Sequence, residues 1–297
     1  MRRILYETLA ALGQNADFPR VQTLGVGIGK LIWNVVPSRR KLAVAAISER
    51  LGLDAPQATA LARSSFQHNG RSFLEIFLSR KVDWRFVRDR LLVDDPAHMQ
   101  RTFNLLRDRA CVITSAHMGG WEMLAGLLHL LAPQQHCQVV VKATHDRDLY
   151  ALIKRLRGHS TVHIVEHEQA VQKVLRNLRK PGTSAFLVDH NCRREEAVFL
   201  PFLGRMAAVN VGPALLALRG KALVMPVFLL REDPDRYRLI YQEPLDAGQL
   251  PGDRHEKIHT LASFYTKAVE RVVLQYPEQW FWMHRRWKTR PGEELAG

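Results

Sequence analysis

The chain has 297 residues, of which 46% are hydrophobic and 24% are charged, and it contains no repeat and no low-complexity segment. This composition is ordinary for a globular protein of one large domain or two small ones. Lysine and arginine number 43 against 29 aspartates and glutamates, which gives a net charge of +14. Such a charge favours a polyanionic partner, either nucleic acid, an anionic lipid or an acidic carrier protein, and does not by itself choose among them.

The cysteines and the hydropathy of the chain argue against several further classes. The three cysteines, Cys111, Cys137 and Cys192, form no CxxC pair, which argues against a disulfide framework or a zinc site. The opening MRRILYETLAALGQN turns polar too early for a signal peptide. A spanning helix needs roughly 20 apolar residues, and the longest candidates fall short of that. We therefore expect no spanning helix, whereas a helix lying on a membrane surface is compatible with the sequence.

The first hundred residues are predicted to be helical. One helical face carries Leu24, Ile28, Leu31, Ile32 and Val35. Pro37 ends that helix, Ser38 opens the next, and Ala55-Pro56 starts a third. The string LGVGIGK lacks the last glycine of a dinucleotide motif, and it lacks the first glycine and the final hydroxyl of a P-loop. We interpret it as a helix with small residues on one face.

Strands and helices alternate from Cys111 onward. The predicted strands are 111–116, 137–142, 162–165, 184–188, 222–230 and 237–242, and the predicted helices are 121–131, 147–157, 168–179, 211–219 and 255–275. Such alternation implies crossover connections and a largely parallel sheet. The predicted fold class is α/β, a mostly parallel central sheet flanked by helices, with a helical region at 1–100 continuous with an α/β core at 101–297.

Three polar residues fall at the carboxyl ends of predicted strands: His117, Lys142 and Asp189. In open sheets of parallel strands, ligands bind beyond these ends. A functional site is therefore expected where these residues meet.

The stretch CVITSAHMGGWEML joins a predicted strand to a helix through His117, Gly119 and Gly120, with Glu122 at the helix start. Glycines let a substrate approach the backbone, and a helix N-terminus can stabilise an oxyanion. The spacing of a histidine and an acid five residues later occurs three times in the chain, and about one match is expected by chance. The alternative is an acid favoured by the helix dipole beside an incidental histidine. The local pattern leaves both open.

Several ordered blocks resemble one family along almost the whole chain. HMGGWE resembles the HxxxWE block of the bacterial lipid A biosynthesis (late) acyltransferases, in the lysophospholipid-acyltransferase-like superfamily. VPSRRKLAV, AFLVDHN, AVFLPFLGRMAAVNVGPALLALRGKALVMPVF and WFWMHRRWKTRP resemble further blocks of that family. The chain departs from the family pattern with His190 in place of Gln, Asn210 in place of Thr, and Lys142 in place of Arg.

The resemblance implies an acyltransferase in which His117 is the general base and Glu122, of the HX4E motif, orients it. Asp189 is the alternative partner, because it lies at the end of a separate predicted strand and could reach the same crevice. The implied substrate-binding residues are Gly119, Gly120, Lys142, Arg157, Asp189, Arg193 and Asn210. Lys142, Arg147, Arg157 and Arg193 are candidates for binding phosphate groups of the substrates, and a solvated basic face is the equal alternative for each of them. No metal and no cofactor is implied, because the acyl group arrives on a thioester co-substrate.

The implied partners are acyl carrier protein and a lipid A precursor at the cytoplasmic face of the bacterial inner membrane. An end segment that mixes tryptophans with cations suits a membrane interface, and packing against the sheet is the equal alternative. Two other functions stay open: an acyltransferase of the same fold acting on another glycolipid or aminolipid, and a basic nucleic-acid-binding protein. The second has only the net charge in its favour, since the basic residues are scattered.

Overall fold

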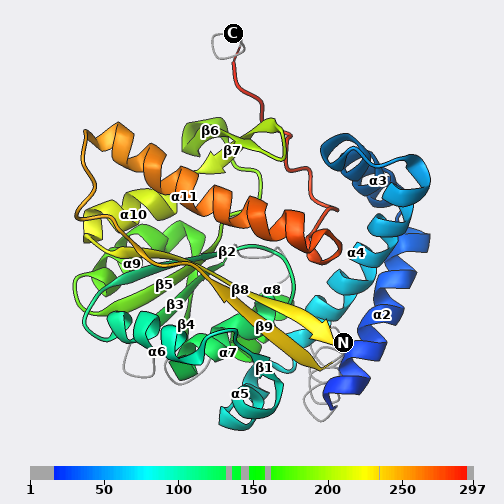
Figure 1. The fold of residues 1–297 in the computed structure, drawn as a ribbon, viewed down its shortest axis with the longest axis horizontal. Helices are drawn as coiled ribbons and strands as arrows, with labels where there is room; N and C mark the ends of the chain where they lie inside the picture. The colour runs from blue at the N-terminus through cyan, green and yellow to red at the C-terminus, as the bar shows by residue number, and fades with distance from the viewer. Residues whose placement is uncertain (1–16, 132–135, 142–146, 158–161, 234, 293–297) are drawn as a thin grey trace.

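The computed structural model describes residues 17–131, 136–141, 147–157, 162–233 and 235–292 (Figure 1). Within these residues eight strands form one sheet in the order β1-β9-β8-β2-β5-β3-β4, with β10 paired to β8. The strands are β1 Leu91–Leu92, β2 Cys111–Ser115, β3 His136–Val141, β4 Val162–Glu166, β5 Gly182–Leu187, β8 Leu223–Asp233, β9 Arg236–Tyr241 and β10 Leu245–Asp246.

Strand β2 lies in the middle of the sheet, parallel to β5 on one side and to β8 on the other. Strand β3 is parallel to both β5 and β4, whereas β9 and β10 run antiparallel to β8. The predicted α/β class and the mostly parallel sheet are confirmed. All six predicted strands are present, with bounds that differ from the predicted ones by up to three residues.

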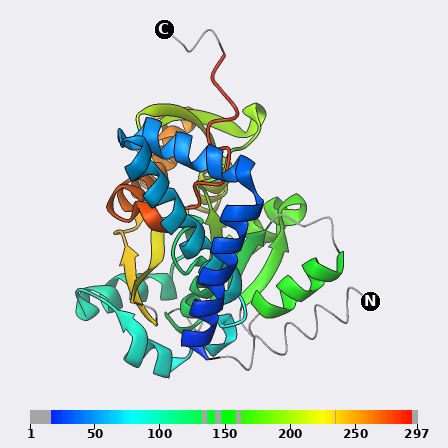
Figure 2. The same cartoon turned by 90° about the vertical axis from the view of Figure 1, so that its right-hand side faces the viewer.

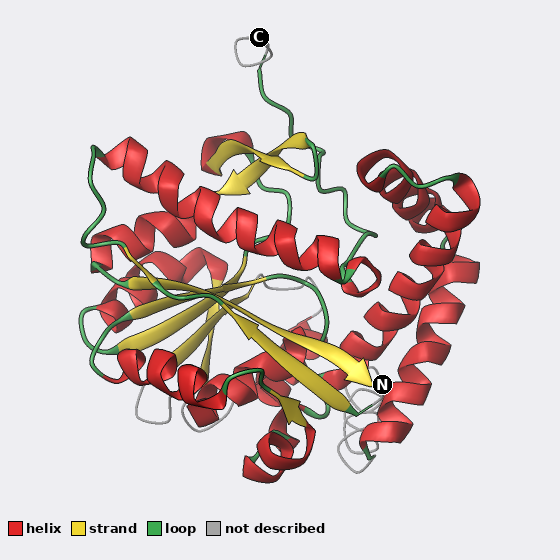
Figure 3. Cartoon of the chain, viewed as in Figure 1, coloured by secondary structure: helices red, strands yellow, loops and turns green. Residues whose placement is uncertain are grey.

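Helices cover both faces of the sheet (Figure 3). Helices α7 Trp121–Leu131 and α8 Arg147–Arg157 lie on one face, and α9 Ala170–Leu178, α10 Gly212–Gly220 and α11 Arg254–Gln275 lie on the other. The buried strand β2 serves two cores, because alternate side chains of a strand point to opposite faces. Cys111 and Ile113 join the core under α7, and Val112 joins the core under α10 and α11.

The first helices of the described chain lie at the side of the sheet: α2 Phe18–Val35, α3 Pro37–Leu51 and α4 Ala55–Glu75 (blue in Figure 2). Helices α2 and α4 pack closely through glycines. A Cβ atom at Gly29 would lie 2.3 Å from the Phe66 carbonyl oxygen, and one at Gly70 would lie 2.2 Å from the Gly25 carbonyl oxygen. The interpretation of LGVGIGK as a helix with small residues on one face is thereby confirmed.

The structure adds elements that the sequence pattern did not predict. Strands β6 Ala197–Phe202 and β7 Arg205–Asn210 form an antiparallel hairpin outside the main sheet, turning at Leu203 and Gly204, which both have positive φ. Short helices α5 Trp84–Arg90 and α6 Pro96–Asn104 precede β2, and of these α5 lies within the region 1–100 that was predicted to be helical. None of the helices in the described ranges is both long enough and apolar enough to cross a membrane. The division of the chain near residue 100 stays a prediction.

Candidate active site

His117 and Asp189 meet at the carboxyl ends of two neighbouring strands. Strands β2 and β5 pair in parallel with Ser115 opposite Leu187, so the residues two positions beyond each strand lie together. His117 Nδ1 is 2.8 Å from Asp189 Oδ1, and the His117 backbone N–H donates to Asp189 Oδ2 at 3.0 Å. The expectation that these two strand ends converge is confirmed.

The Asp189 carboxylate is buried, with 1% of its side chain exposed. Burial alone would raise its pKa, but His117 and His190 and a hydrogen bond from the Trp280 indole at 2.9 Å hold the pKa well below its usual range. An ionised carboxylate only accepts hydrogen bonds, so His117 Nδ1 must carry the proton. In the neutral imidazole, Nε2 then carries the lone pair that can act as a base, on a side chain that remains 22% exposed.

Glu122 lies in the first turn of α7 and is buried. Its Oε1 accepts a hydrogen bond from the Trp121 indole at 3.2 Å, and the Trp121 ring stands edge-on to His117 at 5.6 Å. The carboxylate that contacts Nδ1 of the His117 ring is that of Asp189, which the sequence analysis named as the alternative partner. The orienting role of Glu122 stays a prediction.

The glycines after His117 fit the chain tightly against the sheet. Gly119 has φ of +56°, and a Cβ atom there would lie 2.3 Å from the Leu229 carbonyl oxygen. The Gly119 N–H donates to Gln279, and the Gly120 N–H donates to Leu229 at 2.6 Å. Both backbone N–H groups thus form hydrogen bonds within the protein. Close packing of the backbone in this loop explains why glycine occupies these positions. Their predicted contact with substrate stays a prediction.

A buried ion pair, which was not predicted from the sequence, contacts the backbone at Gly119. Arg231 forms a fork with Glu75, with Nε 2.7 Å from Oε1 and Nη2 2.6 Å from Oε2. The same Nη2 donates to the Gly119 carbonyl at 2.8 Å and to Ser72 at 2.6 Å. Tyr237 also donates to Glu75, at 2.8 Å. The available sequence signal was an arginine that ends the apolar run 222–230.

Two further histidines stack beneath His117. The rings of His117 and His190 lie 3.7 Å apart between centroids with an interplanar angle of 4°, and those of His190 and His284 lie 4.0 Å apart at 14°. Burial and then the charge of His117 lower the pKa of His190 to about 3. Burial, partly opposed by Asp189, lowers the pKa of His284 to about 4. Both rings are therefore neutral near pH 7.

The lowered pKa values of the buried histidines predict that the fold loses stability already in mildly acidic solution. His68, whose pKa is lowered to about 3 by burial and by Arg231 and Arg71, behaves like His190. An unfolded histidine titrates near 6.5, so below that pH the unfolded state binds protons that the folded state does not. The free energy of unfolding should fall as the pH drops from about 6.5 toward 4, by up to about 1.4 kcal/mol per pH unit for each of His68 and His190. Urea denaturation at several pH values measures this, and equal stability at pH 7 and pH 5 would contradict it.

The described part of the structure does not bring the other predicted substrate-binding residues together at His117. Lys142 lies outside them, as do the side chains of Arg147 and Arg157 in α8. Arg193 is exposed in the loop after Asp189. Asn210 accepts a hydrogen bond from the Gly212 N–H at 2.7 Å and so fixes the turn into α10. Binding roles for all of these residues stay predictions.

The end segment packs into the protein. Trp280 and Trp282 are buried, and Trp280 forms a bridge with Met118, next to His117. Trp287 packs against Phe202 and Trp280. The membrane-interface interpretation is therefore wrong for Trp280 and Trp282, and the alternative that this segment packs into the protein is confirmed for these two residues.

The ligand atoms of His117, Asp189 and His190 lie within 4.8 Å of one another, a spacing that a metal ion could use. Both oxygens of Asp189, however, already accept hydrogen bonds from His117 and Trp280. The rings of His117 and His190 are nearly parallel, so their in-plane lone pairs do not converge. The arrangement is that of a hydrogen-bonded acid–base pair, and no metal is assigned here.

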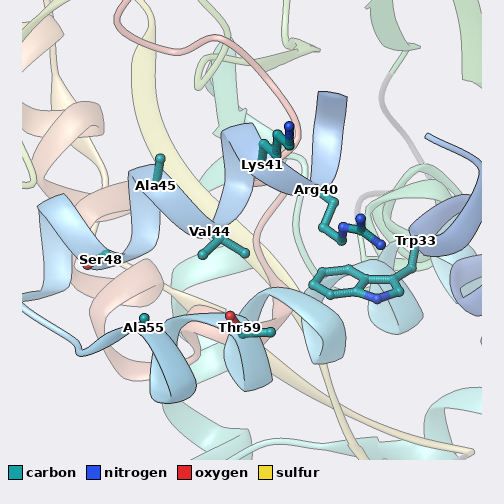
Figure 4. A pocket seen from close by; sticks show the side chains of 8 residues that line it. All are labelled: Trp33, Arg40, Lys41, Val44, Ala45, Ser48, Ala55 and Thr59. Atoms are coloured by element: carbon teal, nitrogen blue, oxygen red, sulfur yellow. The ribbon is translucent and has the colours of Figure 1, made fainter. Parts of the chain in front are cut away.

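A groove of about 610 Å³ lies among the N-terminal helices (Figure 4). It is lined by Trp33, Arg40, Lys41, Val44, Ala45, Ser48, Ala55 and Thr59. The Arg40 guanidinium lies over the Trp33 ring, 5.5 Å from its centroid. The lining thus combines methyl groups and an indole with two cations.

Comparison with known proteins matches residues 8–289 to the family described as bacterial lipid A biosynthesis acyltransferase. The chain is 25% identical over 288 residues to the lipid A biosynthesis lauroyltransferase of Escherichia coli K12, covering 92% of this chain and 87% of that protein. It is 23% identical over 287 residues to the lipid A biosynthesis palmitoleoyltransferase of the same organism, covering 94% and 88%. It is 22% identical over 284 residues to a lipid A biosynthesis acyltransferase of Haemophilus influenzae, covering 93% and 87%.

Proposed function

The chain belongs to the family of bacterial lipid A biosynthesis acyltransferases and is an acyltransferase, and we propose that it moves a fatty acyl chain from acyl carrier protein to a hydroxyl of a lipid A precursor. The observation that carries the proposed chemistry is the His117–Asp189 pair, in which Nδ1 donates to a buried carboxylate and Nε2 has no hydrogen-bond partner among the described residues. A base of this kind is what an unactivated hydroxyl nucleophile needs.

In the proposed mechanism His117 Nε2 takes the proton of the acceptor hydroxyl as its oxygen attacks the thioester carbonyl carbon. Asp189 stabilises the imidazolium that forms and keeps the proton of Nδ1 in place. The tetrahedral intermediate collapses as the C–S bond breaks, and the departing thiolate takes the proton from His117 Nε2. The products are an ester and a free thiol. No protein nucleophile and no cofactor enters this balance.

The function test uses purified full-length protein, a lipid A precursor and acyl-ACP. Mass spectrometry should find the acceptor heavier by one ester-linked acyl chain, with one thiol released per turnover. An acidic carrier that docks by charge should lose kcat/KM more than kcat as salt rises, whereas acyl-CoA should respond less. Equal use of both donors without a salt effect would argue against carrier docking. Absence of ester formation on any offered glycolipid or aminolipid would overturn the proposed function.

The proposal places the protein on a membrane surface through its N-terminal helices. Leu24, Leu31 and Val35 of α2 are 61%, 59% and 62% exposed, and they lie along one side of that helix. Arg20 and Lys30 on the same helix are exposed. Exposed apolar side chains beside cations are complementary to an anionic lipid surface, and the groove of Figure 4 has the same mixed character.

This attachment can be measured with anionic vesicles at low salt. The full chain should sediment with them, and rising salt should weaken the attachment, since each basic residue near the surface contributes about 1 kcal/mol. Leu31→Asp should reduce binding strongly, because it puts a charge on the exposed apolar side of α2. Leu274→Asp is the matched control, since Leu274 is similarly exposed, at 57%, but lies on α11. Equal binding of both variants, or a parent chain that stays in the supernatant, would contradict the assignment.

A further inference from the structure

A hydrogen bond at one nitrogen does not by itself define the plane of a histidine ring. The torsion that turns the ring is broad, so contacts on the ring faces must set the plane. In this site Asp189 bonds Nδ1, the Trp121 ring meets His117 at 65°, and the His190 ring covers one face at 3.7 Å. The parallel stack with His190 is the contact that restricts rotation of the ring most directly.

The stack is anchored on its far side. His284 Nε2 accepts the backbone N–H of Asn191 at 2.9 Å, which places the His284 proton on Nδ1. Asn191 in turn accepts from the Thr289 N–H at 2.9 Å and donates to the Thr289 hydroxyl at 3.0 Å. Hydrogen bonds between the loop after β5 and the end segment thus fix the position of His284, and the His284 ring stacks on His190.

The charged and titratable groups that face His190 are His117, Asp189, His284 and Arg286. Burial keeps His190 neutral, with a pKa of about 3, and the electrostatic effects of His117, His284 and Arg286 act in the same direction while Asp189 opposes them. A neutral ring does not repel the imidazolium that forms on His117 during turnover, as a second charged ring would. The stack therefore suits both charge states of the base.

The Nε2 of His190 is buried and has no hydrogen-bond partner among the described residues. Such an unpaired polar atom is a cost to the fold, so the nitrogen is not what the position requires for stability. The aromatic ring itself is the part of the side chain in use.

We infer that His190 is a positioning residue, whose ring stacks on His117 and holds it in the plane in which Nε2 faces the acceptor hydroxyl. This inference rests on the proposed function, in which His117 is the base. It predicts that position 190 needs a flat ring and does not need an imidazole.

The test compares His190→Ala with His190→Phe in the full-length protein. Misplacement of a reacting group by about 1 Å costs up to about 100-fold in rate, so we expect His190→Ala to lose about 10- to 100-fold in kcat with little change in KM. His190→Phe keeps the stack and should retain kcat within about 3-fold, with a melting temperature at least equal to that of the parent. His255→Ala, at an exposed position in α11, is the control for loss of a histidine.

A second readout is independent of turnover. Ring protons of His117 should show a ring-current shift by NMR in the parent and in His190→Phe, and His190→Ala should lose that shift and show a more mobile ring. Full kcat in a folded His190→Ala, or equal losses in the Phe and Ala variants, would overturn the inference. If the parent transfers no acyl group, the proposed function fails while the NMR comparison still decides whether His190 holds the ring.

Discussion

Replacing His117 with alanine is expected to lower kcat by about 10²–10⁴-fold while leaving the fold intact, because loss of a general base typically costs that much. His117 is partly exposed. Its backbone N–H donates to Asp189 and its ring stacks on His190, and both contacts lie at the site itself. Truncation therefore removes the base without opening the main cores. The measurement is kcat with acyl-ACP, beside a thermal melt of each variant.

The partner of that base is decided by two further variants. Asp189→Asn should fall close to His117→Ala, because an amide can present its NH2 to Nδ1 and so favour the wrong tautomer. The HxxxWE resemblance instead assigns this role to Glu122. Glu122→Gln should then retain more turnover than Asp189→Asn if the geometry is the guide. Full turnover in Asp189→Asn with loss in Glu122→Gln would show that Glu122 is the working carboxylate.

The meeting of His117 and Asp189 could be predicted because it depends on strand pairing. Each residue follows a short apolar run with turn residues beyond it, and parallel strands bring such ends together. What the sequence pattern did not resolve was which carboxylate touches the ring. That choice depends on the directions in which individual side chains point. The spacing from His117 to Glu122 does not determine these directions.

Other features depended on contacts between distant segments. The histidine stack joins positions 117, 190 and 284, and no periodic pattern links these positions. The tryptophans of the end segment looked amphipathic because cations surround them, yet their rings fill the core beside β2 and the β6–β7 hairpin. The hairpin itself was hidden in a run whose small residues, such as Ala207 and Ala208, suit several structures.

The buried pair of Arg231 and Glu75 should carry the largest effect on stability. Both side chains are almost fully buried, and the Arg231 fork serves Glu75, Ser72 and Gly119 together. Removing one partner leaves the other charge buried without compensation, which typically costs about 3–5 kcal/mol. We therefore expect Arg231→Met to lower the free energy of unfolding by about that amount in urea denaturation.

The pairing itself is tested by the double variant Glu75→Gln with Arg231→Met, since it removes both charges at once. It should be more stable than Arg231→Met alone, because the uncompensated carboxylate is gone. Arg205→Met is the matched control, because its pair with Glu49 lies at the surface and such pairs contribute at most about 1 kcal/mol. The same network joins α4 to the carbonyl of Gly119, two residues after the base, so Arg231→Met should also lower kcat below the level that its folded fraction explains. A folded Arg231→Met with unchanged stability and unchanged kcat would refute the view that this buried pair holds the backbone at Gly119 in place.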